Sequence, residues 1–144
     1  MRDELRLVIP IWNGTLLLAD TQGPFKEAFV APGEFAGATD GNLTVLSNFN
    51  TRDSEVILQR WDETPPADTS LDADIAELSV RLASGKVAPY LLISGEVYEH
   101  LDLGHRDLTW RLRVLRSPTG VPDDYDDEED DPIDETFVFQ FWPA

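Results

Sequence analysis

Residues 136 to 142 read Thr-Phe-Val-Phe-Gln-Phe-Trp, and residues 108 to 114 read Leu-Thr-Trp-Arg-Leu-Arg-Val. In both stretches large apolar side chains recur at every second position. Successive side chains of a β-strand point to opposite faces of a sheet, so the pattern predicts strands over residues 108–116 and 136–142, each with one buried face. We expect the rings of Phe137, Phe139 and Phe141 to lie in a core, because fully burying each one contributes about 1.5–3 kcal/mol.

The rest of the chain reads as further short strands. They are predicted over residues 5–12, 15–19, 25–31, 43–49, 55–61, 75–82, 90–93 and 96–103. The dipeptide Asn13-Gly14 predicts a hairpin between the first two, and a second hairpin is predicted between residues 43–49 and 55–61. Pro10 has no N–H to donate, so its strand is expected at a sheet edge or to carry a bulge. Residues 22–29 and 72–78 are the only helical candidates.

This pattern predicts an all-β fold. A chain of 144 residues can bury one core without metal or disulfide support. About 8–10 short strands separated by frequent turns are typical of a β-sandwich. We therefore expect residues 1–144 to form a single-domain antiparallel β-sandwich with at most one or two short helical turns.

Composition restricts the functional classes. The chain contains no cysteine, and its N-terminal segment has two acids among its first four residues and an apolar run interrupted by Arg6 and Pro10. Such a segment makes a poor signal peptide, and no stretch has the roughly 20 apolar residues of a membrane helix. A soluble, cytoplasmic protein is expected. Direct nucleic-acid binding is not expected, because 11 Lys and Arg face 28 Asp and Glu.

The negative charge is concentrated near the C-terminus. Residues 123–135 (DDYDDEEDDPIDE) carry ten carboxylates and no cation. The formal net charge is −17, so the other 131 residues carry only −17 + 10 = −7. We predict that residues 117–135 form an acidic loop inserted between the last two strands, which is long for a connection in a compact domain.

The acidic run has three interpretations. It is a docking segment for a basic protein surface, a solvated loop that aids solubility, or a loop ordered by calcium. The run lacks the glycine that an EF-hand requires at its sixth position. The docking interpretation assigns partner binding to Asp123, Asp124, Asp126, Asp127, Glu128, Glu129, Asp130 and Asp131.

Other residue clusters give no catalytic or metal signature. Both histidines lie in a polar cluster, but their spacing matches neither an HxH pair nor an HExxH helix, so no metal site and no cofactor are predicted. The cluster consists of Glu96, Glu99, His100, Asp102, His105 and Asp107. No nucleophile with a recognisable base is present, and we predict that the protein is not an enzyme. Arg111 and Arg113 share one strand face, where pairing with acids of neighbouring strands is expected.

An alternative function rests on the aromatic residues. If some of their rings lie at the surface, they would form a small-molecule or carbohydrate-binding site, or an enzyme's pocket, in which polar side chains converge among aromatic rings. The candidate rings are those of Trp12, Trp61, Tyr90, Tyr98 and Trp110.

Six landmarks recur in a fixed order along the chain: the opening strand at residues 5–12, TDGNLTV at 39–45, VILQRW at 56–61, residues 76–82, LTWRLRV at 108–114 and the aromatic closing strand. In this order of strands the chain resembles a known family, the ComJ-type competence proteins that inhibit the DNA-entry nuclease. The long acidic loop departs from the family's pattern. The resemblance implies inhibition by partner binding rather than catalysis. The charge pattern independently predicts docking to a basic protein surface, such as the nucleic-acid-binding face of a nuclease. Taken together, the two predict an acidic inhibitor or immunity-type protein that binds the basic face of a nuclease or another nucleic-acid-binding protein.

Overall fold

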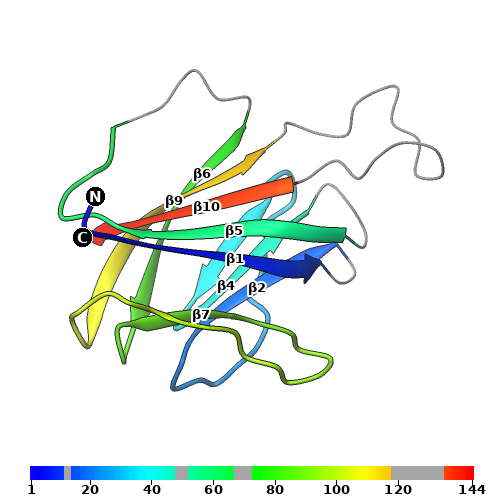
Figure 1. The fold of residues 1–144 in the computed structure, drawn as a ribbon, viewed down its shortest axis with the longest axis horizontal. Helices are drawn as coiled ribbons and strands as arrows, with labels where there is room; N and C mark the ends of the chain where they lie inside the picture. Colours follow the sequence, from blue (N-terminus) through cyan, green and yellow to red (C-terminus); the bar gives the residue numbers. More distant parts are fainter. Residues whose placement is uncertain (12–13, 48–51, 67–72, 118–134) are drawn as a thin grey trace.

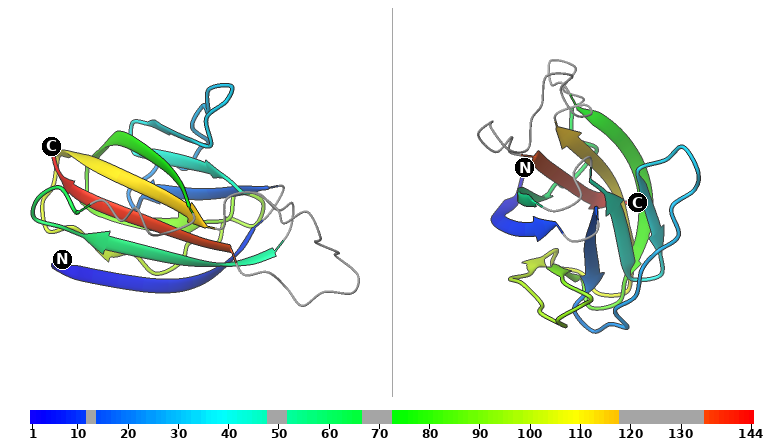
Figure 2. Two further views of the ribbon diagram at one scale, coloured as in Figure 1. Left: turned by 90° about the horizontal axis from the view of Figure 1, so that it is seen from above. Right: turned by 90° about the vertical axis from the view of Figure 1, so that its right-hand side faces the viewer.

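The structure is a computed structural model that describes residues 1–11, 14–47, 52–66, 73–117 and 135–144. These residues form two sheets of five strands that face each other (Figure 1, Figure 2). The strands are β1 (Asp3–Ile11), β2 (Thr15–Asp20), β3 (Ala36–Thr39), β4 (Asn42–Leu46), β5 (Arg52–Arg60), β6 (Asp74–Leu82), β7 (Lys86–Tyr90), β8 (Leu101–Asp102), β9 (Leu108–Ser117) and β10 (Glu135–Pro143). No helix occurs within the described ranges.

The strand order confirms the predicted β-sandwich, with one difference in direction. One sheet has the order β1-β5-β10-β9-β6 and the other β3-β4-β2-β7-β8. Neighbouring strands are antiparallel except β5 and β10, which run parallel with Val56 opposite Phe137 and Leu58 opposite Phe139. These two strands lie far apart in the sequence, so no short hairpin fixes their relative direction.

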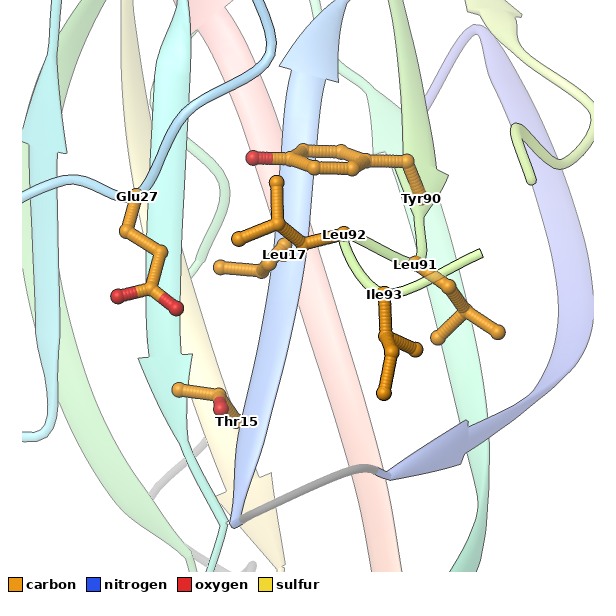
Figure 3. A pocket seen from close by; sticks show the side chains of 7 residues that line it. All are labelled: Thr15, Leu17, Glu27, Tyr90, Leu91, Leu92 and Ile93. Carbon is orange, nitrogen blue, oxygen red and sulfur yellow. The ribbon is translucent and has the colours of Figure 1, made fainter. Parts of the chain in front are cut away.

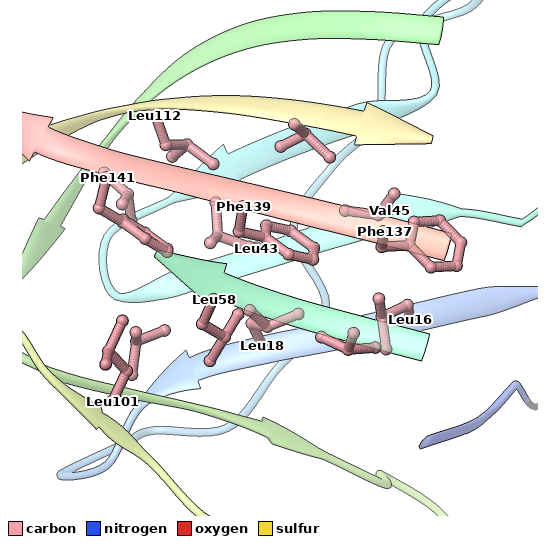
Figure 4. Packing of buried hydrophobic residues seen from close by; sticks show 14 of the residues in the cluster. Leu16, Leu18, Leu43, Val45, Leu58, Leu101, Leu112, Phe137, Phe139 and Phe141 are labelled. Atoms are coloured by element: carbon pink, nitrogen blue, oxygen red, sulfur yellow. The ribbon is translucent and has the colours of Figure 1, made fainter. Parts of the chain in front are cut away.

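One hydrophobic core takes side chains from both sheets. Phe137, Phe139 and Phe141 of β10 and Trp110 of β9 have no exposed surface. Figure 4 shows the three phenylalanine rings among leucine side chains that include Leu16, Leu18 and Leu43 of the opposite sheet. The intervening residues of β10 point outward and are only partly buried. The core role predicted for these aromatic residues is confirmed.

Both predicted hairpins are wrong, although the strands themselves exist. β1 pairs with β5, and β2 pairs with β4 and β7 in the other sheet. The chain between β1 and β2 therefore joins the two sheets. The same holds for β4 and β5, which also belong to opposite sheets. In a sandwich both members of such a pair can bury their apolar faces against each other across the core, and a turn signal does not exclude this arrangement.

Several strand boundaries also differ from the sequence-based expectation. β3 was not expected, residues 91–94 form a turn, and only Leu101–Asp102 of the predicted strand 96–103 is a strand. Residues 25–31 form no strand and residues 22–29 no helix. The second helical candidate is wrong because Asp74–Leu82 forms strand β6.

Pro10 lies where its chemistry predicts. Its strand, β1, is the edge strand of its sheet, and among the described strands it pairs only with β5. A missing N–H is tolerated there because the outer side of an edge strand pairs with no other strand.

Candidate functional site

The acidic residues proposed from sequence lie outside the described residues, but the strands that bracket them are in place. Ser117 ends β9 and lies opposite Thr136 of the antiparallel strand β10. Ser117 and Glu135, the described residues on either side of residues 118–134, therefore lie close together at the same end of the sandwich. Glu135, the last carboxylate of the run, is the first residue of β10 and is fully buried. It accepts a hydrogen bond from the Ser47 hydroxyl. Because it is buried, Glu135 is not available to a partner.

Arg116 ties the two sheets together at this end of the sandwich. Its guanidinium donates to Asp74 Oδ2 from Nη2 at 2.7 Å and to the Leu46 carbonyl from Nη1 at 2.7 Å. It also lies over the Phe35 ring, 4.4 Å from the centroid. These partners come from β6, from β4 and from the segment before β3. A guanidinium with several fixed partners holds neighbouring elements in register, so we interpret Arg116 as structural.

The described part of the chain forms a groove on the outer face of the second sheet. Leu17, Ala19 and Tyr90 form a small buried cluster separate from the main core. Leu17 is the floor of the groove, and its neighbours in β2, Leu16 and Leu18, point into the core. The groove has a volume of about 220 Å³ and is lined by Thr15, Leu17, Glu27, Tyr90, Leu91, Leu92 and Ile93 (Figure 3).

One wall of the groove is the extended segment at residues 24–28. Asn42 and Thr44 are two residues apart on β4 and point to its outer face. Asn42 Oδ1 accepts from the N–H of Lys26 at 3.1 Å, and Thr44 Oγ1 accepts from the N–H of Ala28 at 2.8 Å. With the N–H groups of the residues before and after it held by β4, Glu27 directs its side chain toward the groove (Figure 3). The segment was predicted as a strand, and these side-chain acceptors explain its extended shape.

The other wall is the turn that follows β7. The N–H of Gly95 donates to the Leu91 carbonyl at 2.8 Å, and the N–H of Leu91 donates to the Glu96 carbonyl at 2.8 Å. A positive φ of 74° at Gly95 suits glycine. The turn leaves Leu92 and Ile93 51% and 68% exposed. The turn therefore exposes apolar side chains to solvent while backbone hydrogen bonds hold it in shape.

Tyr90 closes one end of the groove. Its ring packs edge-on against Phe25, with 5.1 Å between the centroids, and only 3% of its surface is exposed. Figure 3 shows the ring crossing above Leu17 with its hydroxyl toward the segment that carries Glu27. That hydroxyl has no hydrogen-bond partner among the described residues. Burial, with a smaller contribution from the Glu27 carboxylate, raises the pKa of Tyr90 to about 12. The phenol thus remains neutral at physiological pH.

This raised pKa predicts a stability change at alkaline pH. The folded protein holds the Tyr90 proton more tightly than the unfolded chain. The resulting stabilisation is fully present below pH 10 and is lost as pH rises to about 12. We expect Tyr90→Phe to flatten this part of the pH profile of the free energy of unfolding, measured by urea titration at each pH. Burial also raises the pKa of the half-buried Tyr98, so Tyr98→Phe serves as the comparison and is expected to flatten the profile less than Tyr90→Phe does. Identical profiles for the wild type and Tyr90→Phe would contradict the assignment.

The aromatic residues proposed from sequence are not gathered at one site. Tyr90 alone among them lines the groove. Trp110 is buried in the core, and Trp12 lies outside the described residues. Trp61 and Tyr98 are half-buried and donate to Gln59 and Glu96, respectively. No sequence pattern marks Leu17, Glu27 or the turn at residues 91–93 as part of a site. Ser94-Gly95 was the available signal that the apolar run ends in a turn.

The polar cluster that contains both histidines is divided among local contacts. Asp102 accepts from the N–H of Gly104 at 2.8 Å, and Asp107 pairs with Arg81 at 3.2 Å. The ring of His105 lies 6.3 Å from that of Trp110. The described residues include no group of three or more His, Cys, Asp or Glu side chains able to hold a metal ion. These contacts give the cluster local structural roles.

The predicted pairing of strand arginines is confirmed for Arg113. Its Nη2 lies 3.1 Å from Glu77 Oε1 on the neighbouring strand, and its Nη1 donates to the carbonyls of Pro65 and Pro66. Trp142 stacks nearby, 5.8 Å from the guanidinium carbon to the ring centroid. The side chain of Arg113 is therefore occupied in holding the segment after β5 against the sheet.

No helix within the described ranges has the length and apolar character needed to span a membrane.

Comparison with known proteins finds similar folds and no match by sequence. No family model and no curated protein matches the chain. A solved structure of ComJ from Bacillus subtilis, an inhibitor of the DNA-degrading activity of NucA, superposes with a TM-score of 0.68 and 10% identity. The superposition covers 97% of this chain and 96% of the ComJ chain. A structure described as crocagin biosynthetic gene J superposes with a TM-score of 0.59 and 14% identity, covering 99% and 97%. The chain thus resembles ComJ in fold along almost its whole length.

Proposed function

We propose that this protein binds a basic protein partner and inhibits it, and that the partner is a nuclease or another nucleic-acid-binding protein. The observation that carries the proposal is the fold shared along almost the whole chain with ComJ, an inhibitor of NucA's DNA-degrading activity. The net charge of −17 supports it independently, because a nuclease needs a cationic face to hold DNA. An anionic protein can occupy such a face in place of the DNA backbone.

The acidic residues 123–131 supply the charge for this contact. They include eight carboxylates within nine residues. Extended, one residue spans about 3.3–3.6 Å, so the charge density is comparable to one phosphate per about 3.4 Å of a DNA strand. Opposite charge at this density steers diffusional encounter with a cationic surface.

An inhibition assay tests the proposal. A purified NucA-like DNA nuclease, taken from the genome that encodes this chain, is incubated with labelled DNA and increasing amounts of the protein. We expect degradation to stop once the protein is in slight molar excess, with a stable complex on gel filtration. Poly-aspartate at equal carboxylate concentration and excess divalent cation are the controls, because they separate specific binding from polyanion competition and metal chelation. Undiminished degradation with no complex would contradict the proposed function.

A further inference from the structure

A second contact site is built into the described part of the molecule, in the groove over β2. We propose that this groove binds a single lysine or arginine side chain of the partner protein, with its aliphatic stem against Leu17 and Ile93 and its cationic head at Glu27. The inference rests on the proposed function, since that function makes the partner a basic protein. It adds an anchoring site to the acidic segment.

Exposed apolar side chains are concentrated in and next to the two segments that supply the walls of the groove, and two of them, Leu92 and Ile93, line the groove itself. Nine large apolar side chains are exposed in the described part of the chain, and five of them lie in residues 25–29 and 91–97. These are Phe25, Phe29, Leu92, Ile93 and Val97. Scattered apolar residues are ordinary on a protein surface, whereas a gathered set around a hollow is typical of a protein-binding site.

The polar groups of the groove select a cation. Glu27 is exposed at its rim, and no described residue forms an ion pair with it. The buried hydroxyl of Tyr90 also has no described partner. An ammonium or guanidinium group can donate to the Glu27 carboxylate, whereas the buried Tyr90 hydroxyl is not open to the groove. An anion would be repelled by Glu27 and by the net charge of the molecule.

The size and shape of the groove fit one long side chain. Its volume of about 220 Å³ is below the roughly 300–1,000 Å³ typical of pockets for drug-sized ligands. Its floor and turn wall are apolar, and its carboxylate lies across from them (Figure 3). Lysine and arginine side chains match this arrangement, because their aliphatic stems pack on apolar surface while their head groups remain charged.

The Thr15 end of the groove lies at the same end of the sandwich as the start of β10. Thr15 lines the groove and pairs with Leu46. The next residue, Ser47, donates its N–H to the Gly14 carbonyl at 2.7 Å and its hydroxyl to Glu135. Thr15 and the start of β10 are thus joined through Ser47. A partner seated at this end can meet the acidic segment and the groove at the same time.

A small cationic probe tests the ligand chemistry without any partner. The isotope-labelled full chain is titrated with n-butylguanidinium and followed by NMR, with butyrate and n-butanol as matched anionic and neutral probes. We expect saturable shifts confined to the groove residues for n-butylguanidinium alone, and at least about tenfold weaker binding in Glu27→Gln. Glu63→Gln is the control, since it removes the same charge from an exposed glutamate after β5. Scattered shifts, equal binding of butyrate, or no shifts would overturn the inference.

The inhibition assay then asks whether the partner uses the groove. We expect Glu27→Gln and Ile93→Ser each to raise the inhibition constant by about tenfold or more, mainly through faster dissociation, and Glu63→Gln to change it less than about twofold. Both replaced side chains are exposed, so the fold is expected to survive, and unchanged thermal unfolding checks this. Unaltered inhibition by both variants would overturn the groove as an anchor and leave the proposed function standing. If n-butylguanidinium binds but the wild type inhibits no nuclease, the proposed function fails and the cation site stands.

Discussion

Replacing the eight acidic residues at positions 123–131 by Asn and Gln is expected to slow association with the basic partner by about 10- to 1,000-fold at low salt. The variant changes the formal net charge from −17 to −17 + 8 = −9 without touching the described core. Exposed charges act at long range only within the screening length, about 8 Å at physiological salt. The wild-type association rate should therefore fall steeply between roughly 50 and 500 mM salt, and the variant's rate should fall much less. Stopped-flow mixing with the NucA-like nuclease measures both.

A shuffled variant separates charge density from specific contact. Permuting residues 123–131 keeps the same residues and the same charge, so steering alone predicts an unchanged association rate. The dissociation rate of the shuffled variant's complex is also expected to change little, because the groove anchors the complex. If the neutralised variant associated as fast as the wild type at every salt concentration, the acidic segment would have no part in encounter. If only the shuffled variant slowed, a specific contact would replace the steering mechanism.

The positions of the long strands could be predicted because burial imposes a two-residue period on them. β6, β9 and β10 were found from alternation alone, and each places its apolar series in the core. The edge position of β1 followed from the missing N–H of Pro10. These inferences depend only on residues within one strand, so neighbours distant in sequence do not alter them.

The pairing of strands could not be predicted, because it depends on contacts that leave no local signal. Asn13-Gly14 favours a tight turn, yet β1 and β2 belong to different sheets. The parallel contact of β5 with β10 joins residues that are about eighty positions apart, such as Val56 and Phe137. In both cases burial of apolar faces across a shared core decides the partner, and many pairings would satisfy the same pattern.

The groove was missed for a related reason. Its wall at residues 24–28 is held by the side chains of Asn42 and Thr44, and nothing in the sequence links these polar residues to the backbone of that wall. Its other wall, Leu91 to Ile93, has the apolar composition of a strand and was interpreted as one. The ComJ-like order of strands was visible in sequence, but the family resemblance assigns no residue of this groove.

Phe139→Ala is expected to lower the free energy of unfolding by about 3–5 kcal/mol, the typical range for deleting a buried phenylalanine ring. Phe139 lies in β10, the middle strand of its sheet, opposite Leu58 of β5 and Val114 of β9. All three side chains have no exposed surface. Removing the ring would leave a cavity between the two sheets. Because strand pairing holds each sheet in place, the neighbouring side chains can fill that cavity only partly. Urea unfolding followed by tryptophan fluorescence measures the loss.

Phe29→Ala is the matched control, because it deletes the same ring where 76% of the residue is exposed. We expect it to change the free energy of unfolding by no more than about 0.5 kcal/mol. Equal losses in the two variants would mean that the ring acts on the unfolded chain rather than through packing. A loss below about 1 kcal/mol for Phe139→Ala would contradict the packed interior. A large difference between the variants would place the closing aromatic strand at the centre of the sandwich, as its alternating sequence predicts.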